Sequence, residues 1–147
     1  MKWAAAALVF ALVVLLSMAW LARQSRQMPP PELPADGRLP PCPASPNCVC
    51  SEPGTDSAHA VPPLPDNWPG LLAAIRAEGG VVDRDDGRFL RAQFRSPVFG
   101  FVDDVLARRD RERGVIQIRS ASRVGRSDFG VNRRRLAVIR ARMREGG

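Results

Sequence analysis

The sequence predicts an α+β domain, in which a four-stranded antiparallel sheet has one amphipathic helix before it and another after it, preceded by an N-terminal transmembrane or signal helix. Three observations predict this class. An apolar run with Ser17 as its only polar side chain occupies residues 3–22. Alternating apolar and polar residues, joined by short turns, follow residue 80, as in hairpin-linked antiparallel strands. Apolar residues at helical spacing lie on either side of those strands.

The apolar run at residues 1–22 contains Ser17 as its only polar side chain after Lys2. A helix of about 20 residues spans the hydrocarbon layer of roughly 30 Å. We expect either a retained single-pass anchor in the inner membrane, with the C-terminal domain in the periplasm, or a signal peptide cleaved after Ser17-Met18-Ala19 and a secreted domain. The length of the run favours the anchor.

Residues 23–47 are predicted to be a linker, because prolines from Pro29 to Pro46 prevent a regular helix or a central strand. Such a segment is semi-extended and would hold the domain away from the bilayer. Residues 48–147 remain for the α+β domain.

The first helix of the domain is predicted at residues 67–78. Asp66 or Asn67 can cap it, and Pro69 suits its first turn. Gly79-Gly80 ends it. Its apolar face consists of Trp68, Leu71, Leu72 and Ile75. A second amphipathic helix is predicted at residues 131–144.

Four strands are predicted between these helices. They begin at Val81-Val82 and continue as residues 89–95, 98–108 and 115–120, with Asp86-Gly87 as a hairpin turn. The apolar residues of the strands are expected to face the helices. The opposite face of the sheet, which must meet water or a partner, carries Arg91, Gln93, Arg95, Gln117 and Arg119.

The net charge is +7 and is unevenly placed. Residues 119–147 contain nine arginines, Asp128 and Glu145, so 9 − 2 = +7. An arginine excess suits anionic partners, among them an anionic lipid or another envelope component, although a solvated helix face would have the same composition. Nucleic acid is not an expected partner, because the chain has no tyrosine and few phenylalanines for base stacking.

Cys42, Cys48 and Cys50 lie close to His59, the only histidine. They suggest either a Cys3His zinc site or, in an exported domain, a disulfide. The spacing fits no common zinc pattern, and a Cys48–Cys50 bridge would be strained. Neither a metal nor another cofactor is expected.

Several linked motifs resemble the family catalogued as domain of unknown function 1499. They are Cys42-Pro43-Ala44-Ser45-Pro46-Asn47-Cys48-Val49, then Asp56 with His59, Phe101-Val102-Asp103-Asp104, and the run from Arg119-Ser120-Ala121-Ser122-Arg123 to Asn132. The resemblance implies an exported or membrane-associated domain without an assigned activity. Cys50 departs from the family pattern, which favours Cys42–Cys48 as the disulfide.

Residues 119–135 are predicted to carry any ligand chemistry, because they join a strand end to a helix start. Hydroxyl groups, guanidinium groups, glycines and helix N-terminal amides suit an oxyanion such as a phosphate, a lipid headgroup or a charged glycan. Val131-Asn132 replaces the Lys-Ser/Thr that a nucleotide hydrolase needs. The candidate anion-binding residues are Arg119, Ser120, Ser122, Arg123, Gly125, Asp128 and Asn132.

Three alternatives stay open. Arg119 or Arg123 can pair with Asp103 or Asp104 in a purely internal network. An envelope hydrolase would use His59 with a serine or an aspartate as acid and base; adjacent aspartates on a strand point to opposite faces and form no dyad. A structural or assembly partner of other envelope proteins needs none of this chemistry.

Overall fold

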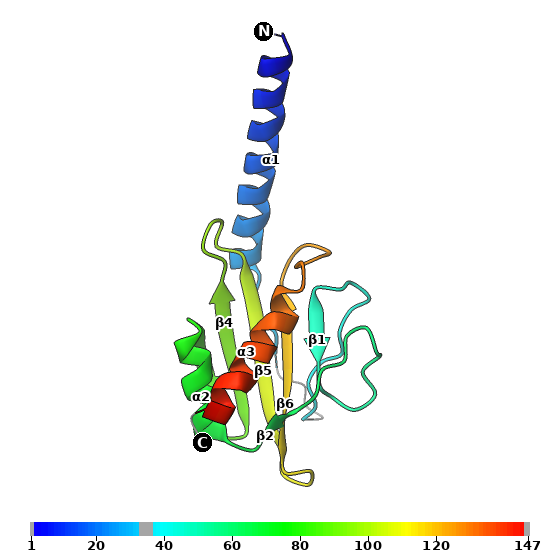
Figure 1. Cartoon of the computed structure of the whole chain (residues 1–147), viewed down its shortest axis with the longest axis vertical. Coiled ribbons are helices and arrows are strands. Elements are labelled where there is room, and N and C mark those ends of the chain that lie inside the picture. Colours follow the sequence, from blue (N-terminus) through cyan, green and yellow to red (C-terminus); the bar gives the residue numbers. More distant parts are fainter. Residues whose placement is uncertain (1, 33–36, 146–147) are drawn as a thin grey trace.

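The computed structural model describes residues 2–32 and 37–145 (Figure 1). In chain order the elements are α1 (Lys2–Gln27), β1 (Cys48–Cys50), β2 (Leu64–Pro65), α2 (Trp68–Ala77), β3 (Val81–Asp85), β4 (Phe89–Arg95), β5 (Val102–Asp110), β6 (Val115–Ser122) and α3 (Val131–Glu145).

The strands form one six-stranded antiparallel sheet in the order β1-β6-β5-β4-β3, with β2 also paired to β6. The predicted α+β class is confirmed, but the four-stranded sheet is wrong. β1 and β2 pair with opposite ends of β6, where Val49 lies opposite Ser120 and Leu64 opposite Ile116. They precede α2, so this helix does not come before the sheet. Two or three residues are too short to show strand alternation.

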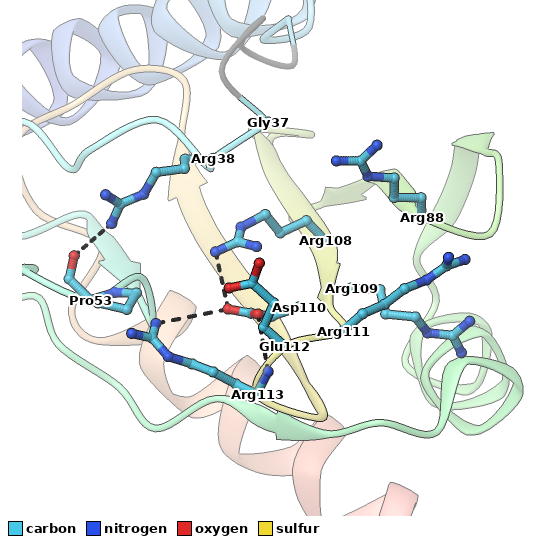
Figure 2. A pocket seen from close by; sticks show the side chains of 10 residues that line it. All are labelled: Gly37, Arg38, Pro53, Arg88, Arg108, Arg109, Asp110, Arg111, Glu112 and Arg113. Carbon is cyan, nitrogen blue, oxygen red and sulfur yellow. Dashed lines mark hydrogen bonds and ion pairs between the residues drawn. The ribbon is translucent and has the colours of Figure 1, made fainter.

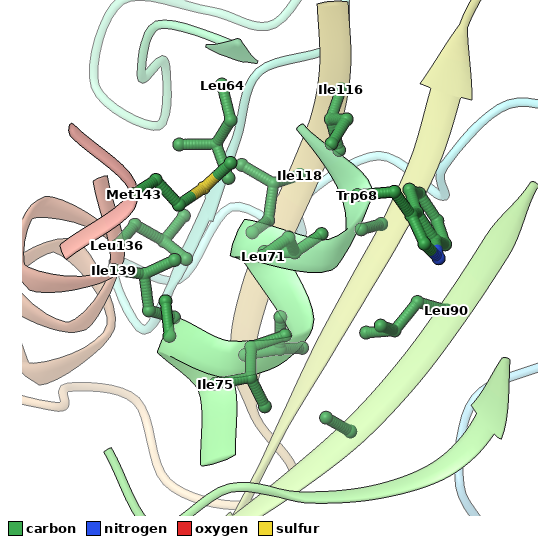
Figure 3. Close-up of a cluster of buried hydrophobic side chains, with 14 of the residues drawn as sticks. Leu64, Trp68, Leu71, Ile75, Leu90, Ile116, Ile118, Leu136, Ile139 and Met143 are labelled. Atoms are coloured by element: carbon green, nitrogen blue, oxygen red, sulfur yellow. The ribbon is translucent and has the colours of Figure 1, made fainter. Parts of the chain in front are cut away.

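Helices α2 and α3 pack on one face of the sheet (Figure 3). Along the chain, both helices begin and end within one residue of their predicted bounds. The Asn67 side chain accepts the Gly70 N–H at 2.9 Å and so caps α2. The core between helices and sheet is formed mainly by Leu71, Ile75, Leu90, Ile116, Ile118, Leu136, Ile139 and Met143.

The strand predicted at residues 98–108 is wrong at its start. Residues 96–100 form a turn, closed by hydrogen bonds from Gly100 N–H to the Ser96 carbonyl and from Ser96 N–H to the Phe101 carbonyl. Gly100 takes a φ of 71° there, which favours glycine. Val98 is therefore an exposed loop residue, and β5 begins at Val102.

The second face of the sheet is partly covered by the chain's own residues 37–42. Leu39 packs with Cys50 and Leu106 in a small apolar cluster, and Cys42 packs against it. Gln117 and Arg119, expected to meet water or a partner, are buried on this face, where the Ser51 hydroxyl donates to Gln117 at 2.7 Å. Residues 33–36 of the predicted linker lie outside the described residues.

The last turns of α1 dock on the domain, next to the start of β5. Ala22 and Ser25 are fully buried, and the Ser25 hydroxyl accepts the Val102 N–H at 2.8 Å. Residues 3–20 are exposed, and by length and composition α1 is apolar enough to cross a membrane. Figure 1 shows α1 continuing the long axis of the domain from the end where β5 begins.

Candidate functional site

The predicted anion-binding residues divide between the two faces of the sheet. Ser120, Ser122, Asp128 and Asn132 meet on the helix side, at the start of α3. Arg123 lies with Asp104, and Arg119 with Leu106, on the opposite face. The sheet therefore separates the two arginines from the hydroxyl and amide groups with which they were grouped.

Asn132 is the centre of the helix-side cluster and is fully buried. Its carbonyl accepts the Ser120 hydroxyl at 2.5 Å. Its amide group donates to the Ser122 hydroxyl at 3.0 Å, to Asp128 at 2.8 Å and to the Asn47 carbonyl at 3.2 Å. These groups satisfy one another, as buried polar groups must, and leave no spare donor on Asn132 for a ligand.

The backbone N–H groups at the start of α3 are already bound by a carboxylate of the chain itself, that of Asp128. The Asp128 carboxylate accepts the backbone N–H groups of Gly130 at 2.9 Å and Asn132 at 2.8 Å. Burial alone would raise the pKa of Asp128, but these hydrogen bonds outweigh it and lower the pKa. Gly125 contributes its carbonyl, which accepts the Asn47 amide at 2.8 Å.

Arg123 and Asp104 form a buried two-point ion pair on the second face. The two contacts measure 2.7 and 2.8 Å, and the side chains are 6% and 4% exposed. Arg123 also donates to the Met28 carbonyl at 2.6 Å. The hydrogen bond with Asp104 raises the pKa of Arg123. Of the internal pairings expected from the sequence, this one is present.

Asp103 points to the helix side and pairs with Arg135 at 2.6 Å. Arg135 also lies over the Phe94 ring at 4.5 Å and donates to the Asn132 carbonyl at 2.7 Å. Asp103 and Asp104 therefore have separate partners on opposite faces and form no carboxylate dyad.

Arg119 differs from the other buried arginines. It is 9% exposed, and its Nε has no hydrogen-bond partner. Within residues 2–32 and 37–145, no hydrogen bond or ion pair involves its guanidinium group. Burial lowers the pKa of Arg119, an effect that nearby Cys50 and Asp104 oppose.

His59 links two loops rather than a serine nucleophile. Its Nδ1 lies 2.7 Å from Asp56 Oδ2, and its Nε2 lies 3.2 Å from the Ser45 carbonyl oxygen. The hydrogen bond from His59 lowers the pKa of Asp56. Both ring nitrogens are thus occupied by oxygen atoms that are not serine hydroxyls, and proton transfer requires a direct contact or one bridging water.

Cys42 and Cys48 form a disulfide, which confirms the pairing that the family resemblance favours. The bond removes two of the four ligands of the alternative zinc site. Cys50 is free and buried, and burial raises the pKa of its thiol. Among the described residues, no group of three or more His, Cys, Asp or Glu side chains is placed to hold a metal ion.

A hollow of about 450 Å³ lies at the other end of the sheet, around the β5–β6 turn (Figure 2). We call it the arginine hollow. It is lined by Gly37, Arg38, Pro53, Arg88, Arg108, Arg109, Asp110, Arg111, Glu112 and Arg113.

Part of the charge in the arginine hollow is matched. Arg108 pairs with Glu52 and, at 3.3 Å, with Asp110. Arg109 pairs with Asp66 at 2.7 Å. Burial alone would raise the pKa of Glu52, but hydrogen bonds led by Arg108 outweigh it and lower the pKa. These ion pairs hold the side chains of Arg108 and Arg109 in place at the edge of the hollow.

The remaining charge is unmatched. Six arginines line the hollow, while Asp110, Glu112, Glu52 and Asp66 supply four acids, so 6 − 4 = +2. Arg88 and Arg111 are exposed and form no ion pair within the described part of the chain; the guanidinium of Arg88 lies over the Phe89 ring at 5.2 Å. Figure 2 accordingly shows no contact for either side chain. Unpaired guanidinium groups around a concavity can bind phosphate or carboxylate in two-point contacts.

The family model described as "Protein of unknown function (DUF1499)" matches residues 38–143. The chain belongs to this family. No curated protein matches the chain. The matched residues of this DUF1499 chain contain the whole sheet and α2, together with the disulfide and most of α3. The match begins at residue 38, after the end of α1, so the apolar helix lies outside the match.

The arginine hollow was not predicted from the sequence, because its residues come from segments far apart in the chain. One signal was present: residues 108–113 read Arg-Arg-Asp-Arg-Glu-Arg, an excess of two positive charges at a hairpin tip. Arg135 and Asn47 were also missed as members of the polar cluster around Asn132.

Proposed function

We propose that this DUF1499 protein is an inner-membrane-anchored envelope domain, facing the periplasm, that binds an anionic ligand in the arginine hollow. The single observation that carries the proposal is the unmatched charge of that hollow, where Arg88 and Arg111 have no acidic partner among the described residues. The ligand chemistry is phosphate or carboxylate, as in a polyanionic glycan. The polar cluster around Asn132 then has a structural role, because its groups are engaged with one another.

The anchor is supported by how α1 continues into the domain. The helix passes without a break through Ser17-Met18-Ala19, the candidate cleavage site, and its last turns are buried at Ala22 and Ser25. An uncut α1 therefore gives the domain packing contacts that a free leader would not. The Cys42–Cys48 disulfide is in keeping with an oxidising compartment.

The position of the hollow restricts the source of the anion. Val102 lies at the end of α1, whereas Asp110 lies at the hollow, at the other end of β5. At about 3.4 Å per residue, β5 separates them by roughly 27 Å. Headgroups of the membrane that holds α1 are therefore out of reach, and a soluble or polymeric anion suits the hollow better.

The experiment measures binding of fluorescein-labelled polyphosphate to the full chain in nanodiscs by fluorescence anisotropy. Alginate, a polycarboxylate, and free inorganic phosphate serve as competitors. In the Arg88→Gln/Arg111→Gln variant we expect affinity to fall about tenfold, since two charge-assisted contacts are lost. Competition by alginate but not by free phosphate would identify a polymeric rather than a monomeric anion as the ligand.

The matched control is Arg76→Gln/Arg144→Gln. It removes the same charge from two exposed arginines that lie outside the hollow. We expect its affinity to remain within about twofold of wild type, apart from the general salt-dependent attraction. Equal losses in both double variants would mean that net charge, rather than the hollow, binds the anion, and the proposal would then be wrong.

A further inference from the structure

Two loops lie beside the last turns of α1, at the end of the domain opposite the arginine hollow. One is the β4–β5 loop, tied to α1 by Arg26, which donates to the Phe99 carbonyl at 2.8 Å. The other is the β6–α3 loop, which begins at Arg123, a donor to the Met28 carbonyl. In Figure 1 both loops point toward the side from which α1 extends.

Each loop exposes a large apolar side chain. Val98 in the β4–β5 loop is 81% exposed, and Phe129 in the β6–α3 loop is 87% exposed. Outside α1, these are the two most exposed large apolar side chains of the described residues. Phe129 has a φ of 52°, a left-handed conformation that is uncommon and strained for a bulky residue. Phe129 therefore keeps a strained backbone conformation although its exposed side chain packs against nothing in the described residues.

The same end carries unmatched positive charge. Five exposed arginines lie in α1, at the end of β4, in the β6–α3 loop or in the first turn of α3, and none forms an ion pair within the described residues. They are Arg23, Arg26, Arg95, Arg126 and Arg134. The acids of this end are engaged elsewhere, Asp103 and Asp104 with arginines and Asp128 with the start of α3. The surface therefore complements anionic headgroups.

The geometry of α1 sets the depth of this surface. The apolar run ends at Ala22, and Arg26 follows about 6 Å further along the helix. That distance lies within the headgroup layer, which adds several ångströms on each side of the hydrocarbon core. The β4–β5 loop bound by Arg26 therefore reaches headgroup depth when α1 spans the bilayer.

We propose that Val98 and Phe129 insert into the interface of an anionic bilayer while the five arginines contact its phosphate groups. We call this end, with both loops and these arginines, the bilayer-contact surface. The inference rests on the proposed anchoring by α1 but does not depend on the arginine hollow. It places the domain upright on the membrane, with the hollow directed away.

The experiment uses the full chain in nanodiscs of phosphatidylethanolamine and phosphatidylglycerol. Four single substitutions, Leu12→Cys, Val98→Cys, Phe129→Cys and Arg111→Cys, each receive an NBD label, and the wild-type chain with its buried Cys50 is the labelling blank. Lipids carrying a nitroxide either near the headgroup, for positions 98, 129 and 111, or on the acyl chain, for position 12, quench NBD only at the bilayer. All four positions are exposed, so the variants retain the fold.

We expect emission at positions 98 and 129 to fall at least about twofold, as at position 12, and emission at position 111 to stay nearly constant. Loss of quenching at position 12 would contradict anchoring itself. Quenching at position 12 without quenching at 98 and 129 would overturn the bilayer-contact surface and leave the anchor standing.

Two further outcomes would also overturn it. Blue-shifted emission at 98 and 129 without quenching would indicate a protein, such as a second copy of the chain, on this surface. Equal quenching at 98, 129 and 111 would mean that the domain has no fixed orientation. Replacing phosphatidylglycerol by phosphatidylcholine removes the anionic headgroups and should reduce quenching at positions 98 and 129 but not at position 12. Unchanged quenching at 98 and 129 would show that the arginines do not contribute to the contact with the bilayer.

Discussion

Buried arginines near α1 and exposed arginines at the arginine hollow, at opposite ends of the β5–β6 hairpin, differ in whether an acid pairs with them. Near α1, Arg123 and Arg135 each contact an aspartate of β5. At the arginine hollow, Arg88 and Arg111 have no acidic partner among the described residues. Arginine content alone therefore does not distinguish a structural cluster from a binding surface, whereas the presence of an acid within hydrogen-bond distance does.

Most of the family motif at residues 119–132 lies in the matched cluster, and Arg119 and Arg126 are its exceptions among the described residues. Ser120, Ser122, Arg123, Asp128 and Asn132 all have partners within the chain. These contacts are consistent with the structural role proposed for the motif, and most of the arginines without an ion pair in the described residues lie outside it. The predictions below test this contrast, beginning with the largest expected effect.

Removing the acid of the buried pair should affect stability most. Asp104→Ala leaves Arg123 buried and without its carboxylate, so we expect the free energy of unfolding to fall by about 3–5 kcal/mol. Urea denaturation measures the loss. The control, Arg142→Ala, breaks the more exposed pair with Glu78 and should cost less than about 1 kcal/mol. If both variants lost less than about 1 kcal/mol, the buried Arg123–Asp104 pair would contribute no more to stability than a surface ion pair does.

Breaking the Cys42–Cys48 disulfide should have the next largest effect. The bond closes a loop with a sequence separation of 6 and holds Asn47 beside Gly125 and Asn132. Reduction of so short a loop should lower the free energy of unfolding by about 2 kcal/mol. Denaturation with and without reductant measures it. The Cys42→Ser/Cys48→Ser variant should be insensitive to reductant; if it is equally sensitive, the effect does not come from this bond.

Replacing Arg119 should change the free energy of unfolding in the opposite direction, toward greater stability. Its guanidinium is buried without a hydrogen bond among the described residues, so Arg119→Met should raise the free energy of unfolding by about 1–2 kcal/mol. Arg123→Met is the matched substitution and should lower it, because Asp104 then loses its partner. Thermal and urea unfolding compare the two. A loss of stability in both variants would mean that Arg119 has a stabilising contact after all.

The helices and the long strands were predictable because their signals are local. The apolar spacing at residues 67–78 and the alternation at residues 89–95 each extend over enough residues to set a period. β1 and β2 are too short to show one, and β2 includes Pro65. Val98 was placed in a strand because it lies four residues before Val102, an even spacing that fits strand alternation although a turn lies between the two residues.

The candidate site was less predictable because its contacts are not local. Alternation correctly placed Gln117 and Arg119 on the face away from the helices, but it gave no sign that residues 37–42 cover that face. Pairing of Arg123 with an adjacent strand was foreseeable from the hairpin, whereas Arg135 reaches Asp103 from α3. The arginine hollow combines residues 37–38 and 53 with the β5–β6 turn, and no sequence pattern joins segments so far apart.

The smallest expected effect concerns Asp128 and depends on pH. Its pKa is lower in the folded protein because hydrogen bonds from Asn132 and Gly130 N–H groups outweigh burial. Such a carboxyl stabilises the fold above its unfolded pKa of about 3.9, and that contribution is lost as pH falls through the folded pKa. Asp128→Asn removes the charge at the start of α3 and turns an amide toward the Asn132 donors, so it should cost about 1 kcal/mol at neutral pH.

Below the folded pKa the wild-type carboxyl carries a proton and presents a similar O–H group to the same donors. The difference in unfolding free energy between wild type and Asp128→Asn should therefore shrink toward zero as the pH falls through the lowered folded-state pKa of Asp128. Urea titrations of both proteins at neutral and acid pH measure this difference, and other acids cancel in the comparison. A difference that stays constant with pH would mean that α3 starts without the help of a charged carboxylate, leaving its N-terminal amides open to an external anion.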